Sequence, residues 1–336
     1  MGTLPVIVGL DYSDRSVQVC VLNEQGQVLG NRGCANDWQA IKEFAESRGR
    51  VVRAAIESCS GAADLADELV TRAGWHVDLA HPGYVARMKQ SPDKTDYQDA
   101  RMVADLERVG YLPRVWLAPE PIRELRHLVR YRQQLVEQRK AVKLRIRALL
   151  REQRCRPPAS VNPWTRAWLS WVSKDALLKD HSRWIMERHL EELRRVADAL
   201  KHVEKRLHEA TSKDPVVVTL QEQPGIGPVT SWTLRAEIGR FERFRTGKQL
   251  ARFCGTSPRN ASSGERVADA GLIRAASPTL RATIIETAHR LIRTQAAWAQ
   301  MAARLRARGK PKCVAVAAVA NRWVRKLYHA MAQQAA

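Results

Sequence analysis

Short apolar runs separated by polar turns fill the first hundred or so residues and predict an α/β domain. Runs at 6–11, 16–22 and 28–33 predict three strands, joined by the polar turns YSDR and NEQGQ. The second run alternates valine with other residues, so one of its faces should be buried. We therefore expect two or three antiparallel strands at the start of the chain.

In the residues that follow, segments with the apolar spacing of a helix alternate with segments that have the apolar spacing of a strand. The predicted elements are helices at 37–49 and 63–74 and strands at 51–57 and 75–82. Asn36 or Asp37 is placed to cap the first helix, and the strand at 51–57 ends in Glu57. With a third helix that begins in SPDKTDYQDARMVADL, the order is β-β-β-α-β-α-β-α. That order matches an RNase H-like α/β domain.

Residues 119–212 have the composition and period of long charged helices. In 123–156, 12 Lys or Arg stand against 3 Glu. The apolar stripe of this helix is formed by Leu125, Leu128, Val129, Leu135, Val136, Val142, Leu149 and Leu150. After a proline-containing break at 155–164, a second helix keeps apolar residues at Leu193, Val196, Leu200, Val203 and Leu207. This spacing predicts a coiled-coil arm, either as an intramolecular hairpin or as an oligomer contact.

The last part of the chain predicts a mostly helical region. It begins near QPGIGPVTSWTLRAEIG, continues through a loop rich in Gly, Ser and Arg at 255–275, and closes in helices. A chain of 336 residues is too long for one ordinary core. We therefore expect an α/β domain over 1–118, a basic helical arm over 119–212 and a C-terminal domain over 213–336.

Charge narrows the class of partner. The chain carries 56 Lys and Arg against 35 Asp and Glu, a net charge of +21, and its pI is about 10.3. Such a balance favours a polyanion, and nucleic acid is the first candidate. An acidic membrane surface is the alternative, which would need a basic amphipathic helix with an exposed apolar face.

The cysteines and the apolar runs indicate which classes of protein this chain does not resemble. The six cysteines are scattered, and none forms a C-x-x-C pair, which argues against a zinc finger and a disulfide framework. Single cysteines are typical of a reducing cytosol. The sequence MGTLPVIVGL lacks the features of a signal peptide, and the longest strongly apolar run, CVAVAAVA at 313–320, is too short to span a bilayer. We expect a cytoplasmic protein.

Acidic residues gather at one predicted edge of the sheet. Asp11 and Glu57 end two strands that should lie side by side, and Asp96 and Asp99 share one face of the third helix. Four converging carboxylates repel one another unless a cation lies between them, and Mg²⁺, as one or two ions, suits hard oxygen ligands. We expect the site to be loosely arranged until Mg²⁺ and DNA bind. Any single acid can instead be a structural cap, as we expect for Asp93.

Two glycines mark a turn near the start of the C-terminal region. The sequence P-G-I-G-P at 224–228 precedes a helical pattern from Val229 and resembles a helix-hairpin-helix turn. In such turns, glycines such as Gly225 and Gly227 let backbone N–H groups approach a phosphate. A plain turn between two helices is the open alternative.

The loop GTSPRNASSGERVADAG contains the serine doublet Ser262-Ser263, flanked by Arg259 and Arg266. A serine hydroxyl is a nucleophile at neutral pH only when something activates it, and no histidine is adjacent. From spacing alone, a Ser-Ser-Gly segment is typical of an ordinary loop.

The basic helix offers a candidate nucleic-acid surface. Its twelve cations greatly outnumber its three acids, so internal pairing cannot neutralise it. We expect Arg139, Lys140, Lys143 and Arg147 to contact nucleic-acid backbones. A solvated helical face is the alternative.

Six sequence blocks in order resemble the DEDD-type insertion-sequence transposases, a family of bridge-RNA-guided serine recombinases of bacterial mobile elements. The blocks are VGLDYS, AAIESCSG, KTDYQDARMVADL, QPGIGPVTSWTLRAEIG, FCGTSPRNASSG and KPKCVAVAAVANRWVRKLYHAM, and they span nearly the whole chain. The sequence departs from the family where Glu-Ala-Thr-Gly is common, because Glu57 is followed here by Ser-Cys-Ser.

The resemblance implies specific roles and partners. Asp11, Glu57, Asp96 and Asp99 would be the Mg²⁺-binding tetrad, and Ser263 the nucleophile that joins covalently to DNA, with Ser262 as its alternative. A noncoding bridge RNA would pair with donor and target DNA while the protein reads RNA shape and backbone. The resemblance also implies a dimer or tetramer, associated with the bacterial nucleoid.

Other functions remain open at this stage. A Holliday-junction resolvase would use the same acids with water, but it would not need the serine loop. A sugar-kinase or actin-like ATPase begins with a similar strand–Asp–turn–strand, but DYSDRS lacks the Gly-Thr that binds phosphate, and no Walker-type motif is present. A non-catalytic RNA-binding protein would fit the charge alone.

Overall fold

The computed structural model describes residues 4–88, 95–262, 264, 269–273 and 276–333. The chain forms two compact units, Met1–Glu120 and Pro121–Ala336.

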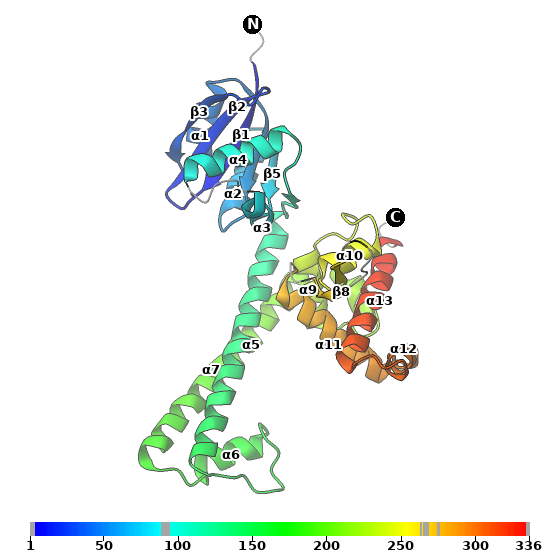
Figure 1. The fold of residues 1–336 in the computed structure, drawn as a ribbon. Helices are drawn as coiled ribbons and strands as arrows, with labels where there is room; N and C mark the ends of the chain where they lie inside the picture. The colour runs from blue at the N-terminus through cyan, green and yellow to red at the C-terminus, as the bar shows by residue number, and fades with distance from the viewer. Residues whose placement is uncertain (1–3, 89–94, 263, 265–268, 274–275, 334–336) are drawn as a thin grey trace. The chain divides into compact units, whose positions relative to one another are not determined.

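A six-stranded mixed sheet, in the order β3-β2-β1-β4-β5-β6, forms the centre of the first unit (Figure 1). Its strands are β1 (Pro5–Tyr12), β2 (Ser16–Asn23), β3 (Val28–Ala35), β4 (Arg50–Glu57), β5 (Val77–Ala80) and β6 (Arg114–Val115). The first three strands pair antiparallel, as predicted. β1, β4 and β5 pair parallel, and β6 closes the edge antiparallel.

Helices cover both faces of this sheet. They are α1 (Trp38–Glu46), α2 (Ala62–Arg72), α3 (Pro82–Met88) and α4 (Asp96–Arg108). Alternate residues of β1 and β2 pack with α1 and α2 in one apolar cluster, while Ala100 and Ala104 of α4 pack on Cys20 and Leu22 on the opposite face. The alternating valines predicted in the second strand therefore lie on the face of the sheet that α1 and α2 cover. Asp37 caps α1 by accepting a hydrogen bond from the Ala40 N–H, as predicted.

Two elements were missing from the expected order, the short helix α3 and the edge strand β6. The helix that carries the acidic residues was predicted to be the third, but the short helix α3 precedes it. Pro82 begins α3 as well as following the strand, because proline fits the first turn of a helix, where its missing N–H has no partner to lose. Asp93 lies outside the described residues, and the N-cap of α4 is Thr95.

Two long helices of the second unit form an antiparallel hairpin, the arm, as the apolar stripes predicted (Figure 1). The arm consists of α5 (Glu120–Glu152), α6 (Arg166–Lys174) and α7 (Asp180–Thr211). Near one end Leu125 and Val129 pack in the cluster of Val203 and Leu207, and near the other the second half of α5 packs with the first half of α7. The seam thus closes within one chain.

The rest of the second unit is mostly helical. Its elements are α8 (Pro215–Glu222), α9 (Pro228–Ile238), α10 (Gly247–Phe253), β7 (Pro258–Asn260), β8 (Asp269–Leu272), α11 (Pro278–Thr294), α12 (Ala296–Ala307) and α13 (Lys312–Gln333). Leu234 and Ile238 of α9 lie in the core with α10, α11 and α13, whereas Trp232 and Ala236 pack with the arm. α9 therefore joins the arm and this core into one packed unit.

Candidate active site

Strand register places Asp11 and Glu57 next to each other on one face of the sheet. Leu10 of β1 pairs with Ile56 of β4, and the two acids are the next residues along these parallel strands. Leu10 and Ile56 point into the cluster under α1 and α2. Because side chains alternate along a strand, Asp11 and Glu57 point to the opposite face, which α4 covers.

Helix α4 packs against that face without any intervening side chain. A Cβ added to Gly9 of β1 would overlap the Ala100 carbonyl oxygen and the Ala104 backbone nitrogen. Glycine at this position lets the helix approach the strand closely, two residues before Asp11. Asp99 precedes Ala100 and is only 6% exposed, whereas Asp96 is exposed.

The direction of α4 brings its acidic first turn to the carboxyl ends of β1 and β4. At its far end, Arg108 donates to the Glu24 carbonyl oxygen, in the turn beside the start of β1. At its near end, the Tyr97 carbonyl oxygen accepts from Asn31 at 2.9 Å. The helix therefore runs opposite to β1, and Asp96 and Asp99 lie toward Asp11 rather than away from it.

Polar side chains that sequence reasoning missed hold the start of α4. Thr95 accepts a hydrogen bond from the Gln98 N–H, which caps the helix. Gln18, the partner of Asp11 across the β1–β2 ladder, donates to Asn31 at 2.7 Å, and Asn31 in turn holds Tyr97. The capping residue was readable in the sequence, since Thr precedes the acidic turn. The Gln18–Asn31 link depends on strand register and was not.

Cys59 lies two residues after Glu57, beside the edge where the acids meet, and is exposed. Partial desolvation raises the pKa of its thiol, and the carboxylates of Glu57, Asp11 and Asp14 raise it further. Cys59 stands in the segment after β4 where the sequence departs from the family pattern. The departure therefore leaves Glu57 beside Asp11, although it changes the chemistry of the adjoining turn.

The four acids share an edge, but their side chains do not form a ready metal site. No group of three or more His, Cys, Asp or Glu within the described residues is arranged to hold a metal ion. Their carboxylate oxygens are nevertheless the hard donors that Mg²⁺ accepts. Their role as metal ligands stays a prediction.

The serine loop lies in a short β-hairpin of the second unit. Ser263 and Arg266 lie outside the described residues, so their roles stay predictions. Arg259 is exposed on β7, and the Ser262 N–H donates to the Asn260 side chain at 2.7 Å. Gly264 adopts a left-handed conformation with φ of 55°, which favours glycine directly after the candidate nucleophile.

The core anchors the start of this hairpin through a residue that the sequence did not single out. Asn321 of α13 donates to the Thr256 carbonyl oxygen and to the Ser257 hydroxyl, both at 3.2 Å. Thr256 is buried and donates its hydroxyl to the Ala251 carbonyl oxygen. These contacts fix the segment from which the serine loop projects.

The two glycines of the 224–228 turn have different environments. Gly225 is left-handed, with φ of 84°, and an added Cβ would lie 2.7 Å from Leu291. Its carbonyl oxygen accepts from Arg290 at 2.9 Å. Gly227 is the N-cap of α9, and an added Cβ there would meet nothing within 4 Å. The left-handed backbone therefore favours glycine at 225, whereas the open surroundings of Gly227 suit the predicted phosphate contact better.

The basic helix is partly neutralised, contrary to the sequence argument. Arg130 pairs with Glu237, Arg132 with Glu204 and Arg145 with Glu192. The acids come from α7 and α9, so counting charges within α5 alone missed them.

The predicted contact residues differ from these paired cations. Arg139, Lys140, Lys143 and Arg147 make no ion pair with an acid in the part of the chain that the structure describes. Burial, Arg139 and Arg147 all lower the pKa of Lys143. Lys143 and Arg147 instead lie over the Trp164 ring, with their charged groups 4.5 and 5.8 Å from its centroid. A positive cluster without acidic partners therefore remains on the second half of α5, and its contact with nucleic acid stays a prediction.

No helix in the described part of the chain is long and apolar enough to cross a bilayer.

Comparison with protein families identifies two matching regions. Residues 8–154 match a DEDD-type IS110 family model described as a transposase, and this range includes all four acids. Residues 218–304 match a model described as the transposase IS116/IS110/IS902 family, and this range includes the glycine turn and the serine loop.

Relatives that match two thirds or more of this chain carry consistent names. The transposase for insertion sequence element IS1111A of Coxiella burnetii is 24% identical over 288 residues, which cover 85% of this chain and 78% of that protein. The probable family 20 transposase of Pseudomonas aeruginosa is 26% identical over 291 residues, which cover 85% of this chain and 84% of that protein. For the putative transposase y4qE of Sinorhizobium fredii, identity is 26% over 221 residues, and the match spans 66% of this chain and about half, 54%, of that relative. Two separate regions of the chain therefore match models of the IS110 and IS116/IS110/IS902 transposase families, and the relatives that match most of its length are named as transposases.

Proposed function

We propose that this transposase exchanges DNA strands through a covalent serine intermediate at a Mg²⁺-dependent acidic site. The observation that carries the proposal is the meeting of Asp11, Glu57 and the first turn of α4 at one edge of the sheet. The strand order and the helices on both faces support an RNase H-like fold for this unit.

Asp11, Glu57, Asp96 and Asp99 would hold the metal, as one or two ions. Asp96 is exposed, Asp99 is buried against the sheet, and the described carboxylates do not surround a common point, so we expect them to rearrange when an ion binds. Bound Mg²⁺ would stabilise the negative charge that develops on the scissile phosphate.

Ser263 carries the covalent step in this proposal. Its Oγ gives up its proton and forms a bond to the scissile phosphorus, the P–O bond to one DNA strand breaks, and the departing oxygen takes up a proton and leaves as a hydroxyl. A free DNA hydroxyl then attacks the phosphoserine, the Oγ–P bond breaks, and the serine regains its proton. One phosphodiester replaces another, so strand exchange needs no nucleoside triphosphate.

Nucleic acid supplies the specificity. A noncoding bridge RNA pairs with donor and target DNA, and the basic cluster on α5 contacts the backbones. The net charge of +21 and the unpaired cations of α5 support this assignment. The acting form is a homodimer or tetramer, in which one subunit supplies the acids and another the serine.

The proposal is tested by trapping covalent adducts between the transposase and labelled DNA from the ends of its element, with the element's RNA and Mg²⁺ present. Ser263→Ala should abolish the adduct while RNA binding persists, and Ser262→Ala, the matched control, should retain it. Asp99→Asn should abolish both cleavage and adduct. An adduct that survives Ser263→Ala rules out this nucleophile, and DNA cleavage without any adduct would favour a resolvase that uses water.

A further inference from the structure

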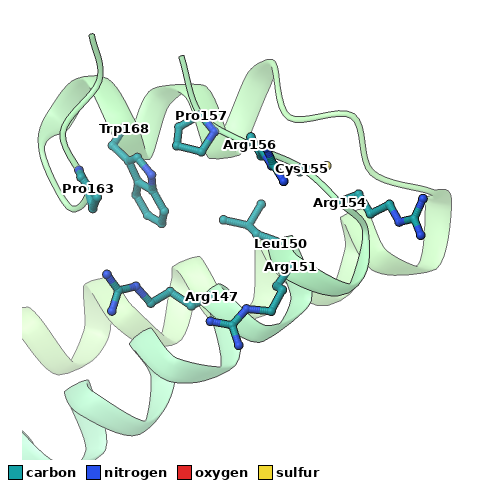
Figure 2. Close-up of a pocket in the computed structure, with 9 residues that line it drawn as sticks. All are labelled: Arg147, Leu150, Arg151, Arg154, Cys155, Arg156, Pro157, Pro163 and Trp168. Carbon is teal, nitrogen blue, oxygen red and sulfur yellow. The ribbon is translucent and has the colours of Figure 1, made fainter. Parts of the chain in front are cut away.

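An open cavity of about 920 Å³ lies at the tip of the arm, far along the chain from the acidic residues. It lies between the end of α5, the following loop and α6 (Figure 2). The lining residues are Arg147, Leu150, Arg151, Arg154, Cys155, Arg156, Pro157, Pro163 and Trp168. Its volume lies in the range that holds a small ligand or a nucleotide.

Four arginines and no acid line this cavity. Figure 2 shows Arg147 and Arg151 on the side of α5 and Arg156 on the side of the loop. All four guanidinium-bearing residues, Arg154 included, are exposed, and none pairs with a carboxylate in the described part of the chain. Like charges gathered around one hollow repel one another, so an anion there would be stabilised by all of them.

Backbone conformation gives a second, independent reason to regard this tip as specialised. Arg154 has φ of 53°. It occupies the position after α5 where the Cys155 N–H bonds back to the Leu150 carbonyl oxygen at 2.9 Å, a helix ending that usually has glycine at this point. Arginine is strained there, which glycine would not be. A charged side chain in a position better suited to glycine indicates a role for the charge.

The opposite wall of the cavity is apolar and firmly held. Trp168 is 3% exposed and packs against Trp164 with ring centroids 4.5 Å apart. Trp164 is the other non-glycine residue with positive φ in the described part of the chain, at 68°. The Cys155 thiol donates to the Leu177 carbonyl oxygen at 2.8 Å, which ties the loop to the segment before α7. The arginines therefore line a hollow with one fixed apolar wall, and the Arg154 side chain lies at its outer margin (Figure 2).

We infer that this cavity binds the phosphodiester backbone of a nucleic-acid strand. The inference rests on the proposed function, because it assumes that the transposase holds RNA and DNA. It adds a defined anchor at the tip of the arm to the contacts expected along α5. Guanidinium groups bind phosphate oxygens through paired hydrogen bonds, and the open cavity gives a backbone phosphate access to several of them.

The test measures binding of the full chain to 20-nucleotide single-stranded RNA, single-stranded DNA and duplex DNA by fluorescence anisotropy over a range of salt concentrations. Three probes distinguish the source of the phosphates. The variants are Arg154→Gly, Arg156→Ala and the double variant Arg151→Ala/Arg154→Gly. Arg194→Ala removes one exposed arginine from α7, outside the cavity, and is the matched control for Arg156→Ala.

For at least one probe, the double variant should bind about tenfold more weakly than the parent chain. The slope of log affinity against log salt should fall by roughly 0.7 for each lost contact to a single strand, or roughly 0.9 to a duplex. Arg154→Gly should at the same time leave the melting temperature unchanged or raise it, because glycine relieves the left-handed strain. Binding loss without stability loss is an outcome that a merely structural role does not produce.

The inference is overturned if all three probes bind the double variant and Arg156→Ala as tightly as the parent chain. It is also overturned if Arg194→Ala weakens binding as much as they do, since charge in general would then explain the loss. If the tip variants bind normally and the parent chain forms serine adducts, the cavity is not a binding site, but the proposed chemistry stands. Weakened binding with no adduct in the parent chain removes the proposed chemistry and leaves the site.

Discussion

The acidic edge of the sheet and the basic tip of the arm position their charges by opposite means. At the sheet, Asp99 lies in a buried layer because α4 packs directly on Gly9. At the arm, the apolar seam between α5 and α7 is buried, and the arginines of the cavity stand outside it. Folding of the sheet unit therefore also brings the backbone positions of its acids to one edge, whereas the tip arginines are not part of the apolar seam that holds the arm together.

This difference predicts how stability and function respond to substitution. Changes that loosen α4 should weaken the fold and displace the acids together. Changes at the tip should alter nucleic-acid binding without lowering the stability of the fold, as expected for Arg154→Gly. The following predictions test the sheet side of this comparison first, from the largest expected effect to the smallest.

The largest effect is expected for Gly9→Ala. The new methyl group would overlap the Ala100 carbonyl oxygen, so α4 must move away from β1. Overpacking of this kind costs about 3 kcal/mol of unfolding free energy. Urea unfolding measures the loss, and adduct formation should fall with it. Gly33→Ala on β3 is the control, because its Cβ would come no closer than 3.7 Å to the Gln18 side chain. Equal losses in the two variants would contradict the close approach of α4.

The second effect concerns the buried acid at the other end of α4. Glu107 is fully buried, and its Oε1 lies 2.8 Å from Arg114 and 3.3 Å from Arg53. Its Oε2 has no hydrogen-bond partner in the described part of the chain. Glu107→Gln keeps the shape and removes the charge that both arginines face.

Because both arginines are partly exposed, we expect a loss of about 2 kcal/mol rather than the larger cost of breaking a fully buried pair. Urea unfolding again measures it. Asp105→Asn, which removes an exposed pair with Arg108, is the control and should change stability by less than about 1 kcal/mol. A Glu107→Gln variant as stable as that control would show that the buried pairs contribute little.

Some features of the acidic site could be predicted from the sequence because they depend on local patterns, and others could not because they depend on strand register. Asp11 and Glu57 were readable because each ends an apolar run, and parallel strands end at a common edge. The pairing of Gln18 with Asn31 was not, because it depends on register between β2 and β3. The short helix α3 was missed because it spans only 7 residues, which is too few for an apolar period to show.

The arm shows the same limit for charges. Its hairpin was predicted because apolar spacing within each helix is local information. The partners of Arg130 and Arg132 were missed because Glu237 and Glu204 lie far along the chain. The cavity at the tip was also missed, because no glycine or motif marks the left-handed turn at Arg154.

A smaller effect is expected at the cap of α4. Thr95 accepts from the Gln98 N–H at 3.3 Å, and Thr95→Ala removes this acceptor. Loss of an N-cap costs about 1 kcal/mol, and here it frays the turn that carries Asp96 and Asp99. Urea unfolding and adduct formation should both decline, and Thr95→Ser should restore both. If Thr95→Ala lowers stability but leaves adduct formation intact, the helix start does not position the acids.

The smallest effect is expected for an ion pair on the arm. Arg145 lies 3.3 Å from Glu192, and both side chains reach solvent. A double-mutant cycle with Arg145→Ala and Glu192→Ala should give a coupling free energy of about 0.5 kcal/mol, because solvent screens exposed pairs. The coupling should disappear in 1 M salt, where the screening length is only about 3 Å.

That salt dependence sharpens the contrast between the two regions. The loss from Gly9→Ala is steric and should survive in high salt, whereas the arm pair should not. A coupling at Arg145 that persists in 1 M salt would mean that the arm, like the sheet, fixes its charges by burial. The tip arginines could then no longer be treated as independent of the fold, and the separation of binding from stability expected for Arg154→Gly would lose its physical basis.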